Sequence, residues 1–384
     1  MFAGEGKTVL GKPTDSTGHW KGTRTFLVDR KEAESQTVTS FYLRPEDGGP
    51  LAAYKPGQFL SFQFDIPGFD KPVKRSYTLS DSPGGLENGK LYRLSIKREP
   101  SPKDQPDLPP GASSNFFHDH LEAGSALQVI APTGDFYLQE NSDRTVVLLS
   151  GGVGLTPMIS MLNHFVDQGD QRPVWFLHGV QNGDEHAFRG HVRQLAEAHD
   201  RVNAYVVYAE PGPDDVQGRD YDAAGFFNIQ ILQRLLPGPD ADFYLCGPPP
   251  FMKALYNALL DWGVDEARIF YEFFGPATVL KNDVSPASVP REAPSASATG
   301  LEVVFLDSGV TAIWDGTQDC LLELAEAHGV DADFSCRSGV CHTCMSSLME
   351  GEIEYIHDDV FLPDEEDEVL ICSAIPKTNI VLDL

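Results

Sequence analysis

The alternation of apolar and polar residues changes twice along this chain, and each change predicts a different kind of structure. From about residue 18 to residue 138, short alternating runs are separated by turn clusters at 46–50 and 82–85. Several short strands at regular intervals are typical of a small antiparallel barrel. The predicted strands cover residues 23–29, 38–43, 58–64, 75–79, 92–97 and 126–130.

From residue 145 onward, apolar strand-like runs alternate with amphipathic helix-like runs. This alternation is typical of a doubly wound α/β domain with a parallel sheet. The predicted strands cover 145–150, 174–178, 202–208, 242–246 and 269–273, and the predicted helices cover 156–168, 187–199, 228–236 and 250–262.

A third pattern begins near residue 300 and predicts a compact α+β domain. It has strands at 301–306, 352–355 and 380–382, a helix at 320–328 and a cysteine-containing loop. The preceding stretch, 281–299, is rich in Pro, Ala and Ser and is typical of a mobile tether. We therefore expect an N-terminal extension (1–17), a β-barrel domain (18–140), an α/β domain (141–277), a linker (278–299) and an α+β domain (300–384).

Composition and charge exclude several classes of function. A chain of 384 residues is long enough for two or three domains with separate cores. The net charge of −28 argues against binding to nucleic-acid backbones or anionic membranes. Residues 1–10 lack the pattern of a signal peptide, and glycines and Pro157 interrupt the most apolar window, 145–166. We expect a soluble cytoplasmic protein without a membrane span.

The acidic residues are concentrated at the end of the chain. Residues 300–384 contain 19 acidic and two basic residues, a net charge of −17, whereas residues 1–299 carry −11. Five of the six cysteines lie in the same segment, four of them at 336, 341, 344 and 372. Clustered cysteines in a chain without a secretion signal favour metal binding over disulfides.

The spacing of these cysteines predicts an iron–sulfur site. Cys336, Cys341 and Cys344 form C-x4-C-x2-C, and Cys372 follows after 27 residues. This spacing is the plant-type signature of a [2Fe–2S] cluster, in which four thiolates converge on two irons. Zinc is the alternative, but zinc sites usually use two short cysteine pairs. Cys320, on the apolar side of a predicted helix, is expected in the core.

Two motifs in the barrel region could bind a phosphorylated aromatic ligand. In 75–80 (RSYTLS), Arg75 can pair with a phosphate, Tyr77 on the same strand face can stack on a ring, and Thr78 can bond its edge. Ordinary packing of a barrel strand would explain this hexamer equally well. In 111–115 (GASSN), small residues precede a helix-like run and could form an anion site, although a plain capped helix fits too.

The α/β region contains a glycine-rich turn after its first strand. In 150–157 (SGGVGLTP), Thr156 is a good N-cap and Pro157 suits the first helical turn. The glycines would let a pyrophosphate approach the amides at the helix N-terminus. The segments 245–249 (LCGPP) and 271–276 (YEFFGP) follow later strands, at the sheet edge where open α/β sheets bind ligands.

Taken in order, the motifs R-x-Y-T, G-x-x-S-N, GGVGLTP, HAFR (186–189), YLCGPPPFM (244–252) and YEFFGP resemble the ferredoxin–NADP reductase superfamily. The closest likeness is to the reductase half of flavohaemoglobins and covers residues 20–276. Residues 300–384 resemble a plant-type ferredoxin with a β-grasp fold. We expect no globin domain before Trp20 and therefore no nitric-oxide dioxygenase role. The domain order resembles the reductase components of Rieske-type oxygenases, such as phthalate dioxygenase reductase.

The resemblance implies roles at matching positions. Tyr77, Thr78, Cys246 and Glu272 would take part directly in catalysis, and Cys336, Cys341, Cys344 and Cys372 would bind the cluster. The implied flavin contacts are Phe59, Arg75, Ser76, Tyr77, Thr78, Ser95, Ile96, Lys97, Gly111, Ser113, Ser114, Phe273, Phe274, Gly275 and Pro276. The implied nicotinamide dinucleotide contacts are Gly151, Gly152, Val153, Gly154, Leu155, Thr156, Cys246, Gly247 and Pro248.

The implied cofactors are FAD, a [2Fe–2S] cluster and NADH. FAD is favoured over FMN by the Ser-Asn-x-x-His run at 114–118 and by YEFFGP. Acidic residues after the strand 202–208, beginning with Glu210, favour a ribose hydroxyl over the 2′-phosphate of NADPH. Arg219 could reverse that preference, so NADPH stays open.

We therefore expect an NAD(P)H:acceptor oxidoreductase that passes hydride to FAD and single electrons through the cluster to a partner protein. The expected partner is a Rieske-type mono- or dioxygenase with a basic docking surface. A hybrid-cluster protein, a P450 or a quinone is an alternative acceptor, and a redox-sensing module is a different class of function. His118, His120, His178 and His186 are expected to be structural or cofactor-shell residues. The acidic run at 364–368 is either a solvated face or a surface that steers the cluster toward basic partners.

Overall fold

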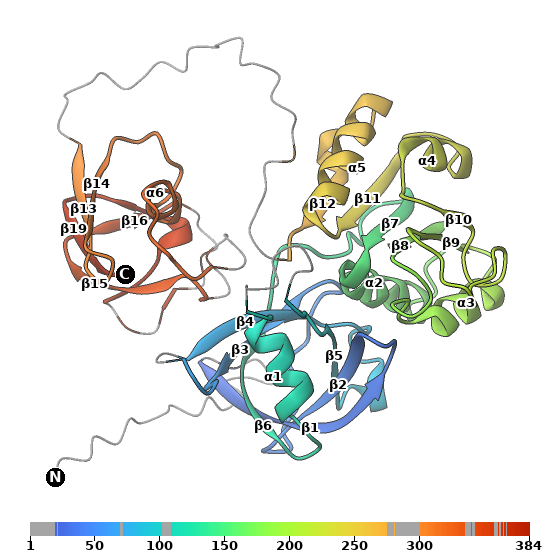
Figure 1. Cartoon of the computed structure of the whole chain (residues 1–384), viewed down its shortest axis with the longest axis horizontal. Coiled ribbons are helices and arrows are strands. Elements are labelled where there is room, and N and C mark those ends of the chain that lie inside the picture. The colour runs from blue at the N-terminus through green and yellow to red at the C-terminus, as the bar shows by residue number, and fades with distance from the viewer. Residues whose placement is uncertain are drawn as a thin grey trace. The chain divides into compact units, whose positions relative to one another are not determined.

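The structure is a computed structural model, and it divides into two compact units, Met1–Asn282 and Asp283–Leu384. The first unit contains a barrel and an α/β sheet, and the second contains a small α+β domain (Figure 1). No helix in the described part of the chain is long and apolar enough to cross a membrane. The described residues are 20, 22–69, 72–101, 109–274, 280, 300–334, 339, 342–356, 360, 362–363, 365 and 367–384, so the expected extension (1–17) and the tether (281–299) lie outside them.

Six antiparallel strands form the predicted barrel, in the order β4-β3-β6-β1-β2-β5. The outer strands meet, because Leu79 bridges Leu94 and the Ser80 amide donates to Arg93 O at 2.8 Å. The apolar faces of the strands enclose an aromatic core, and α1 (Ala112–His120) adds the fully buried Phe117 to it. The strands are β1 (Thr23–Ala33), β2 (Val38–Pro45), β3 (Phe59–Phe64), β4 (Val73–Thr78), β5 (Tyr92–Lys97) and β6 (Ala126–Thr133).

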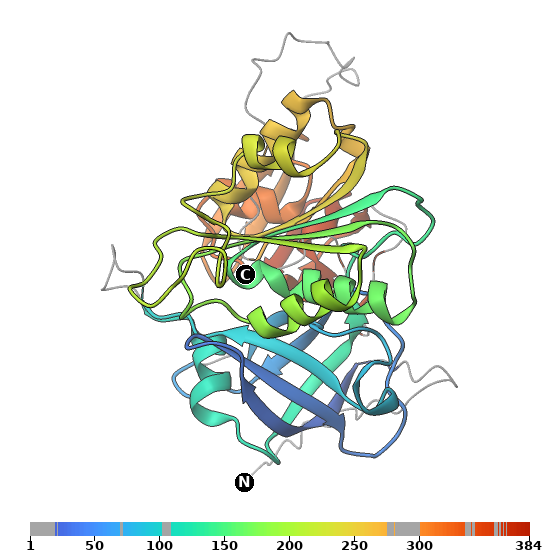
Figure 2. The same ribbon diagram turned by 90° about the vertical axis from the view of Figure 1, so that its right-hand side faces the viewer.

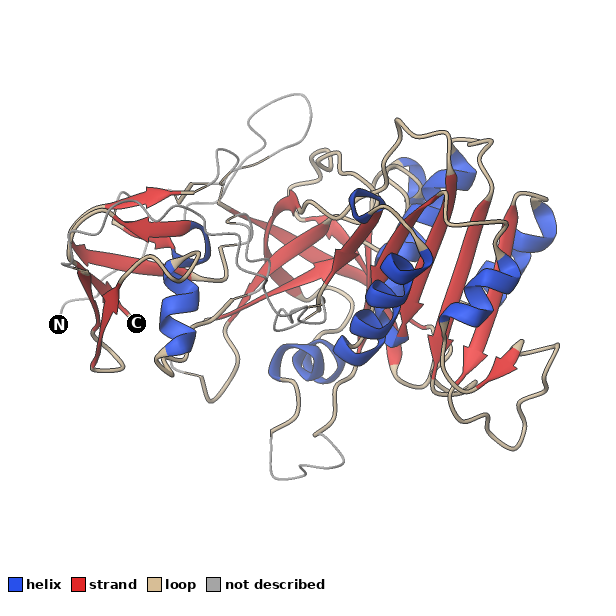
Figure 3. Ribbon diagram, turned by 90° about the horizontal axis from the view of Figure 1, so that it is seen from above, coloured by secondary structure: helices blue, strands red, loops and turns tan. Residues whose placement is uncertain are grey.

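The second sheet has the order β10-β9-β8-β7-β11-β12, and every neighbouring pair is parallel. Helices cover both faces, α2 and α3 on one side and α4 and α5 on the other (Figures 2 and 3). This doubly wound arrangement confirms the predicted fold. The strands are β7 (Thr145–Gly151), β8 (Val174–Val180), β9 (Val202–Tyr208), β10 (Ala223–Ala224), β11 (Ala241–Cys246) and β12 (Ile269–Glu272), and the helices are α2 (Leu155–Asp167), α3 (Arg189–Ala198), α4 (Ile229–Leu235) and α5 (Pro249–Trp262).

The start of α2 differs from the prediction. The chain turns through a 3-10 segment at Gly152–Gly154 and passes directly into α2 at Leu155. Gly154 therefore occupies the N-cap position, and Thr156 lies inside the helix with its hydroxyl donating to Val153 O at 3.2 Å. The prediction that Thr156 caps this helix was wrong. The glycine turn leads directly into the helix at Leu155, so the helix has already begun when the chain reaches Thr156.

The second unit has a five-stranded sheet in the order β14-β13-β19-β15-β17, with the small pair β16–β18 beside it. Helix α6 (Leu321–Ala327) packs its buried leucines against the main sheet. Cys320 is the N-cap residue of α6 and is buried in this core, as expected. The strands are β13 (Leu301–Phe305), β14 (Val310–Trp314), β15 (Met345–Glu350), β16 (Ile353–Tyr355), β17 (Glu368–Leu370), β18 (Ala374–Pro376) and β19 (Ile380–Asp383).

Candidate functional site

The C-terminal half of β4 meets α1 where the sequence predicts a flavin. The Tyr77 hydroxyl donates to Ser113 Oγ at 3.0 Å and so joins the strand to the helix. The Tyr77 ring lies edge-on to Phe117, with centroids 5.0 Å apart. Burial raises the pKa of Tyr77 to about 12, so its hydroxyl stays protonated at physiological pH. Thr78 is buried and pairs with Phe59 on β3.

The other two predicted residues of β4 already contact the barrel. Arg75 donates to the carbonyl of Lys74 at 2.7 Å, and Ser76 Oγ lies 2.8 Å from Ser61 Oγ on β3. Side chains alternate along a strand, so Arg75 shares a face with Tyr77, whereas Ser76 lies on the opposite face beside its cross-strand partner Ser61. The arrangement keeps a guanidinium and an aromatic ring together on one face of β4.

A tight turn leads into α1. Gly111 is its N-cap residue, and a Cβ there would lie 2.8 Å from Ser114 Oγ and 3.0 Å from Glu99 Cβ. Ser114 Oγ donates back to Gly111 O at 3.2 Å, and the Asn115 side-chain amide donates to the same oxygen at 2.8 Å. The helix begins at Ala112, so residues 112–115, which were expected to precede it, lie inside it. A glycine turn at the positive end of a helix that Tyr77 joins to β4 fits the pyrophosphate of a flavin dinucleotide.

The predicted backbone-contacting segment 95–97 lies on β5. Ser95 is buried, and its hydroxyl lies 2.8 Å from two other serine hydroxyls of the barrel. The carbonyl of Ile96 accepts a hydrogen bond from His118 Nε2 at 3.0 Å. Lys97 Nζ lies 3.4 Å from Glu185 Oε2 of the α/β domain. The structure thus places Ser95 and Ile96 in the barrel and Lys97 where the two domains meet.

The glycines after β7 let two loops approach closely. A Cβ on Gly154 would lie 2.3 Å from Cys246 O, and one on Gly151 would lie 2.9 Å from Pro248 Cδ. Gly152 has φ +54, and nothing lies within 4 Å of its Cβ position. The space beside Gly152 and the backbone at the start of α2 fit a dinucleotide phosphate, which would occupy the space that a side chain would fill.

The carboxyl ends of β11 and β12 bring two predicted residues together. Cys246 pairs in register with Glu272 on the neighbouring strand. A Cβ on the next residue, Gly247, would lie 3.0 Å from the amide nitrogen of Gly151 in the glycine loop. Burial, with a smaller effect of the Glu272 charge, raises the pKa of the Cys246 thiol. The thiol is therefore neutral and a poor nucleophile. Phe273 packs on the core, Phe274 is exposed, and Gly275 and Pro276 lie outside the described residues.

Two histidines lie under this sheet edge. His178 is fully buried, and its Nδ1 lies 2.9 Å from Ser150 Oγ, at the end of β7. His186 Nδ1 lies 2.8 Å from the Tyr208 hydroxyl, and the two imidazole centroids are 5.4 Å apart. Burial lowers the pKa of His178 to about 4 and that of His186 to about 2. Both rings are neutral at physiological pH and have structural partners.

The chain beyond β9 carries the residues expected to discriminate between NADH and NADPH. Glu210 follows β9 and accepts a hydrogen bond from Gln181 at 3.1 Å. Arg219 pairs with Asp220 through contacts of 3.0 and 2.6 Å, and this hydrogen bonding lowers the pKa of Asp220 to about 2. Arg189 also lies 3.2 Å from Asp220. A pocket of about 250 Å³ between α3 and β9 is lined by both signs of charge.

Two of the four predicted cluster ligands lie in the described part of the second unit. Cys344 and Cys372 are buried in the same core, and the amide of Ile371 donates to Cys344 O at 3.4 Å. Gly339 has φ +75, and a Cβ there would lie 2.6 Å from Ser373 Oγ. The cysteine loop thus comes close to Cys372, as four-thiolate binding requires. Cys336 and Cys341 lie outside the described residues.

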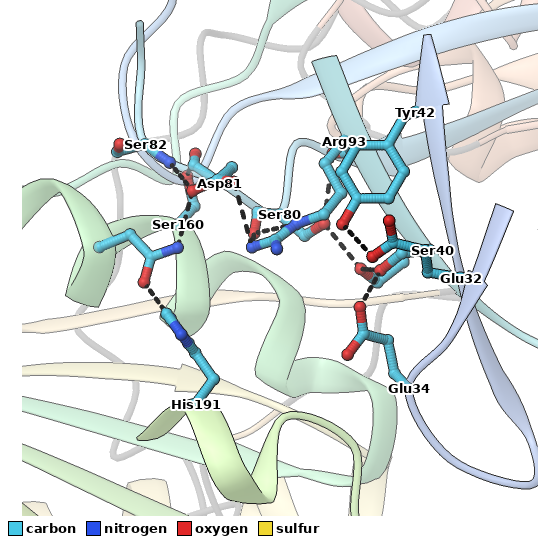
Figure 4. Close-up of polar contacts among 12 residues, drawn as sticks. Glu32, Glu34, Ser40, Tyr42, Ser80, Asp81, Ser82, Arg93, Ser160 and His191 are labelled. Atoms are coloured by element: carbon cyan, nitrogen blue, oxygen red, sulfur yellow. Dashed lines mark hydrogen bonds and ion pairs between the residues drawn. The ribbon is translucent and has the colours of Figure 1, made fainter. Parts of the chain in front are cut away.

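A polar cluster that the sequence motifs did not predict lies where the barrel meets the α/β domain (Figure 4). Asp81 of the barrel contacts Ser160 and Asn163 on α2, and it also pairs with Arg93 of the barrel. Asn163 in turn contacts His191 on α3. A signal was present in the sequence, because Ser160 and Asn163 are polar and lie three positions apart in the stretch 157–163, whose other residues are all apolar. Such residues on a buried helix face indicate partners from another part of the chain.

Two family models match this chain. The oxidoreductase NAD-binding domain matches residues 148–256, and the 2Fe-2S iron-sulfur cluster binding domain matches residues 304–377. The first match covers the glycine loop and the Cys246 loop, and the second covers all four predicted cluster ligands.

Among curated relatives, a flavohemoprotein of Halalkalibacterium halodurans is 43% identical over 274 residues, which are 71% of this chain and 65% of that protein. The chain thus spans slightly less than two thirds of the length of this relative.

Solved structures extend the likeness. The FAD/NAD-binding domain of nitric oxide dioxygenase from Vibrio cholerae is 38% identical, with a TM-score of 0.58, and covers 67% of this chain and all of that one. Phthalate dioxygenase reductase is 22% identical, with a TM-score of 0.53, and covers 94% of this chain and 98% of that one. The second likeness shows a shared fold.

Proposed function

The chain belongs to the ferredoxin–NADP reductase superfamily, with a flavohaemoprotein-type reductase module followed by a [2Fe–2S] ferredoxin domain, and from this premise we propose that it transfers electrons from NADH to a partner protein. The observation that carries the proposal is the presence in one chain of a module similar to a FAD/NAD-binding reductase domain, followed by a 2Fe-2S domain. A sensor would not need a complete nicotinamide loop.

The residues of the first unit would bind and orient the two dinucleotides. When bound, FAD accepts hydride from NADH and passes its electrons singly to the [2Fe–2S] cluster. Arg75 and the turn at Gly111 would bind the flavin pyrophosphate, and Tyr77 would pack against the ring. The neutral thiol of Cys246 would border the nicotinamide without attacking it. No residue here needs to act as a general acid or base, so catalysis depends on orientation.

NADH is the reductant we propose. Glu210 would repel a 2′-phosphate, and Arg219, which could have attracted one, is paired with Asp220. Charge pairing between Arg189 and Asp220 further reduces the positive charge available to a phosphate. We expect the specificity constant for NADH to exceed that for NADPH.

The acceptor we propose is the Rieske-type terminal component of a mono- or dioxygenase. The support is the arrangement shared with phthalate dioxygenase reductase over nearly the whole chain. A thiolate-bound iron cluster also favours a reducing compartment, so the cytoplasm is the proposed location.

Removing one cluster ligand tests the proposal. Cys372→Ser should lower the iron content and abolish NADH-driven reduction of a Rieske-type oxygenase, whereas reduction of ferricyanide by the flavin should persist. Cys320→Ser, a second buried cysteine of the same domain, is the matched control and should keep both activities. Equal loss of both reactions in Cys372→Ser would contradict the order of electron flow. Reduction of a P450 but of no Rieske-type oxygenase would overturn the proposed acceptor.

A further inference from the structure

The polar cluster between the barrel and the α/β domain centres on Asp81 (Figure 4). Strand β4, which carries the predicted flavin contacts, ends at Thr78, and Asp81 lies three residues beyond it. We call Asp81, Arg93, Ser160, Asn163 and His191 the Asp81 cluster. Asp81 and Arg93 are each only 8% exposed, so both charged groups are largely removed from solvent.

Asp81 uses both its carboxylate and its backbone carbonyl to hold α2. One carboxylate oxygen accepts from the Ser82 amide at 2.8 Å and from Asn163 Nδ2 at 2.7 Å. The other lies 3.4 Å from an Arg93 nitrogen. The Asp81 carbonyl accepts from Ser160 Oγ at 2.7 Å. One barrel residue therefore binds two successive turns of the helix.

The cluster continues to α3. His191 Nε2 lies 2.6 Å from Asn163 Oδ1 and therefore acts as the donor. Burial lowers the pKa of His191, so the ring is neutral and keeps a single proton for this bond. The Arg93 guanidinium donates to the carbonyl of Ser80 and lies 4.9 Å from the ring centroid of Phe188, just before α3. Both helices on this face of the sheet are thus connected to the barrel.

These contacts connect the two parts of the chain that have to meet for hydride transfer. Helix α2 begins at the end of the predicted dinucleotide loop, and Ser160 lies about 7.5 Å along the helix from Leu155 at the usual rise per residue. A reacting pair must lie within about 3–3.5 Å, and a displacement of about 1 Å can cost about 100-fold in rate. A buried carboxylate with partners on both sides also resists sliding, because each broken contact would leave a buried charge uncompensated.

We propose that Asp81 is a positioning residue, which fixes the dinucleotide loop relative to the flavin strand at the separation needed for hydride transfer. The proposal rests on the proposed function. Asp81→Asn tests it, because the new amide would place a donor against Arg93 or against Asn163 Nδ2. Asn163→Ala is a second variant that removes the same contact from α2. Asp240→Asn, an exposed partner of Arg144 before β11, is the control.

The measurement is anaerobic stopped-flow reduction of the flavin by NADH, expressed per bound FAD. We expect the limiting rate in Asp81→Asn and Asn163→Ala to fall about 10- to 100-fold, with the dissociation constant of NADH changing by less than about threefold. The isotope effect with NADH deuterated at C4 of the nicotinamide should rise. Amide hydrogen exchange of residues 158–163 in the holoenzyme should accelerate in both variants, and the effects in the double variant should be less than additive.

A merely structural role predicts something else: lower FAD content and thermal stability with an unchanged limiting rate per bound FAD. That result would overturn the proposal, and so would an equal slowing by Asp240→Asn. If the wild-type protein does not oxidise NADH at all, the proposed function fails and this inference fails with it. If the wild type oxidises NADH normally and the Asp81 and Asn163 variants have the same limiting rate of flavin reduction, the positioning role is refuted and the proposed function is not.

Discussion

Buried polar residues of the first unit should affect the pH dependence of its stability, and single substitutions can measure their effects. His178 is neutral in the folded protein because burial lowers its pKa to about 4, whereas an unfolded histidine titrates near 6.5. Protons therefore bind more readily to the unfolded chain between these values, and stability has to fall as the pH falls through this window.

The pH dependence of unfolding checks this expectation. Between pH 7.5 and pH 5, the free energy of unfolding should fall by about 2 kcal/mol, because His178 stays neutral in the folded protein while it becomes protonated in the unfolded chain. In His178→Asn, which can keep a hydrogen bond to Ser150, that part of the pH dependence should disappear. The measurement is the first thermal or urea transition followed by circular dichroism at the two pH values. Wild-type and variant curves that shift in parallel with pH would contradict the assignment.

Tyr77 offers a test of the flavin site itself. Tyr77→Phe keeps the ring but removes the hydrogen bond to Ser113, which should raise the dissociation constant of FAD about fivefold, as expected for the loss of about 1 kcal/mol. Fluorescence titration of the apoprotein with FAD would measure it. Tyr92→Phe is the matched control, because its hydroxyl bonds to Ala52 O elsewhere in the barrel. Equal weakening by both variants would indicate a general loss of barrel stability.

Secondary-structure elements were predictable where local pattern and tertiary contacts agree. β5 and β9 have the predicted bounds, although Arg93 and Ser95 of β5 are buried despite their polarity, which the alternation did not predict. β14, β15, β17 and β18 were missed. Their sequences are short and partly polar, as in Met345–Glu350, and they become strands only through partners distant in sequence. Thr156 failed as a cap for the same reason, because the contact of Gly154 with the Cys246 loop sets the start of α2.

The close contact between Gly154 and the Cys246 loop allows a test of dinucleotide binding at the glycine loop. Gly154→Ala would place a Cβ 2.3 Å from Cys246 O and force α2 and β11 apart. Overpacking of this kind typically costs about 1–3 kcal/mol, so we expect the KM for NADH to rise about tenfold or more while FAD stays bound. Steady-state kinetics with NADH and ferricyanide would measure the change. Gly190→Ala, in α3 with open space at its Cβ position, should leave the KM unchanged. A normal KM in Gly154→Ala would argue against dinucleotide binding at this loop.

The distribution of charge concerns the molecule as a whole. Residues 300–384 carry −17 of the total of −28, although they make up less than a quarter of the chain. Glu365 and Asp367 are exposed just before β17, and the predicted ligand Cys372 follows this strand. The sequence shows that this segment is acidic, but not where it lies in the fold. Its position depends on the pairing of β15 with β17.

Salt should separate the two halves of the reaction. Raising the ionic strength from about 50 mM to about 500 mM shortens the screening length several-fold and should slow reduction of a protein acceptor. Reduction of bound flavin by NADH should change little. Stopped-flow measurements of each step would test this difference. An acceptor rate that is insensitive to salt would mean that the acidic face is only a solvated surface.

The position of β19 in the second unit has a consequence for biosynthesis. β19 lies between β13 and β15, and its pairing with β13 is parallel, so the last described strand of the domain completes the centre of its sheet. A nascent domain emerging from the ribosome has no continuous sheet until residues 380–383 are available. The reductase module, whose strands are all made earlier, can acquire FAD during translation. We therefore expect a complete sheet around the iron–sulfur site only after residues 380–383 have been made, later than the strands of the reductase module.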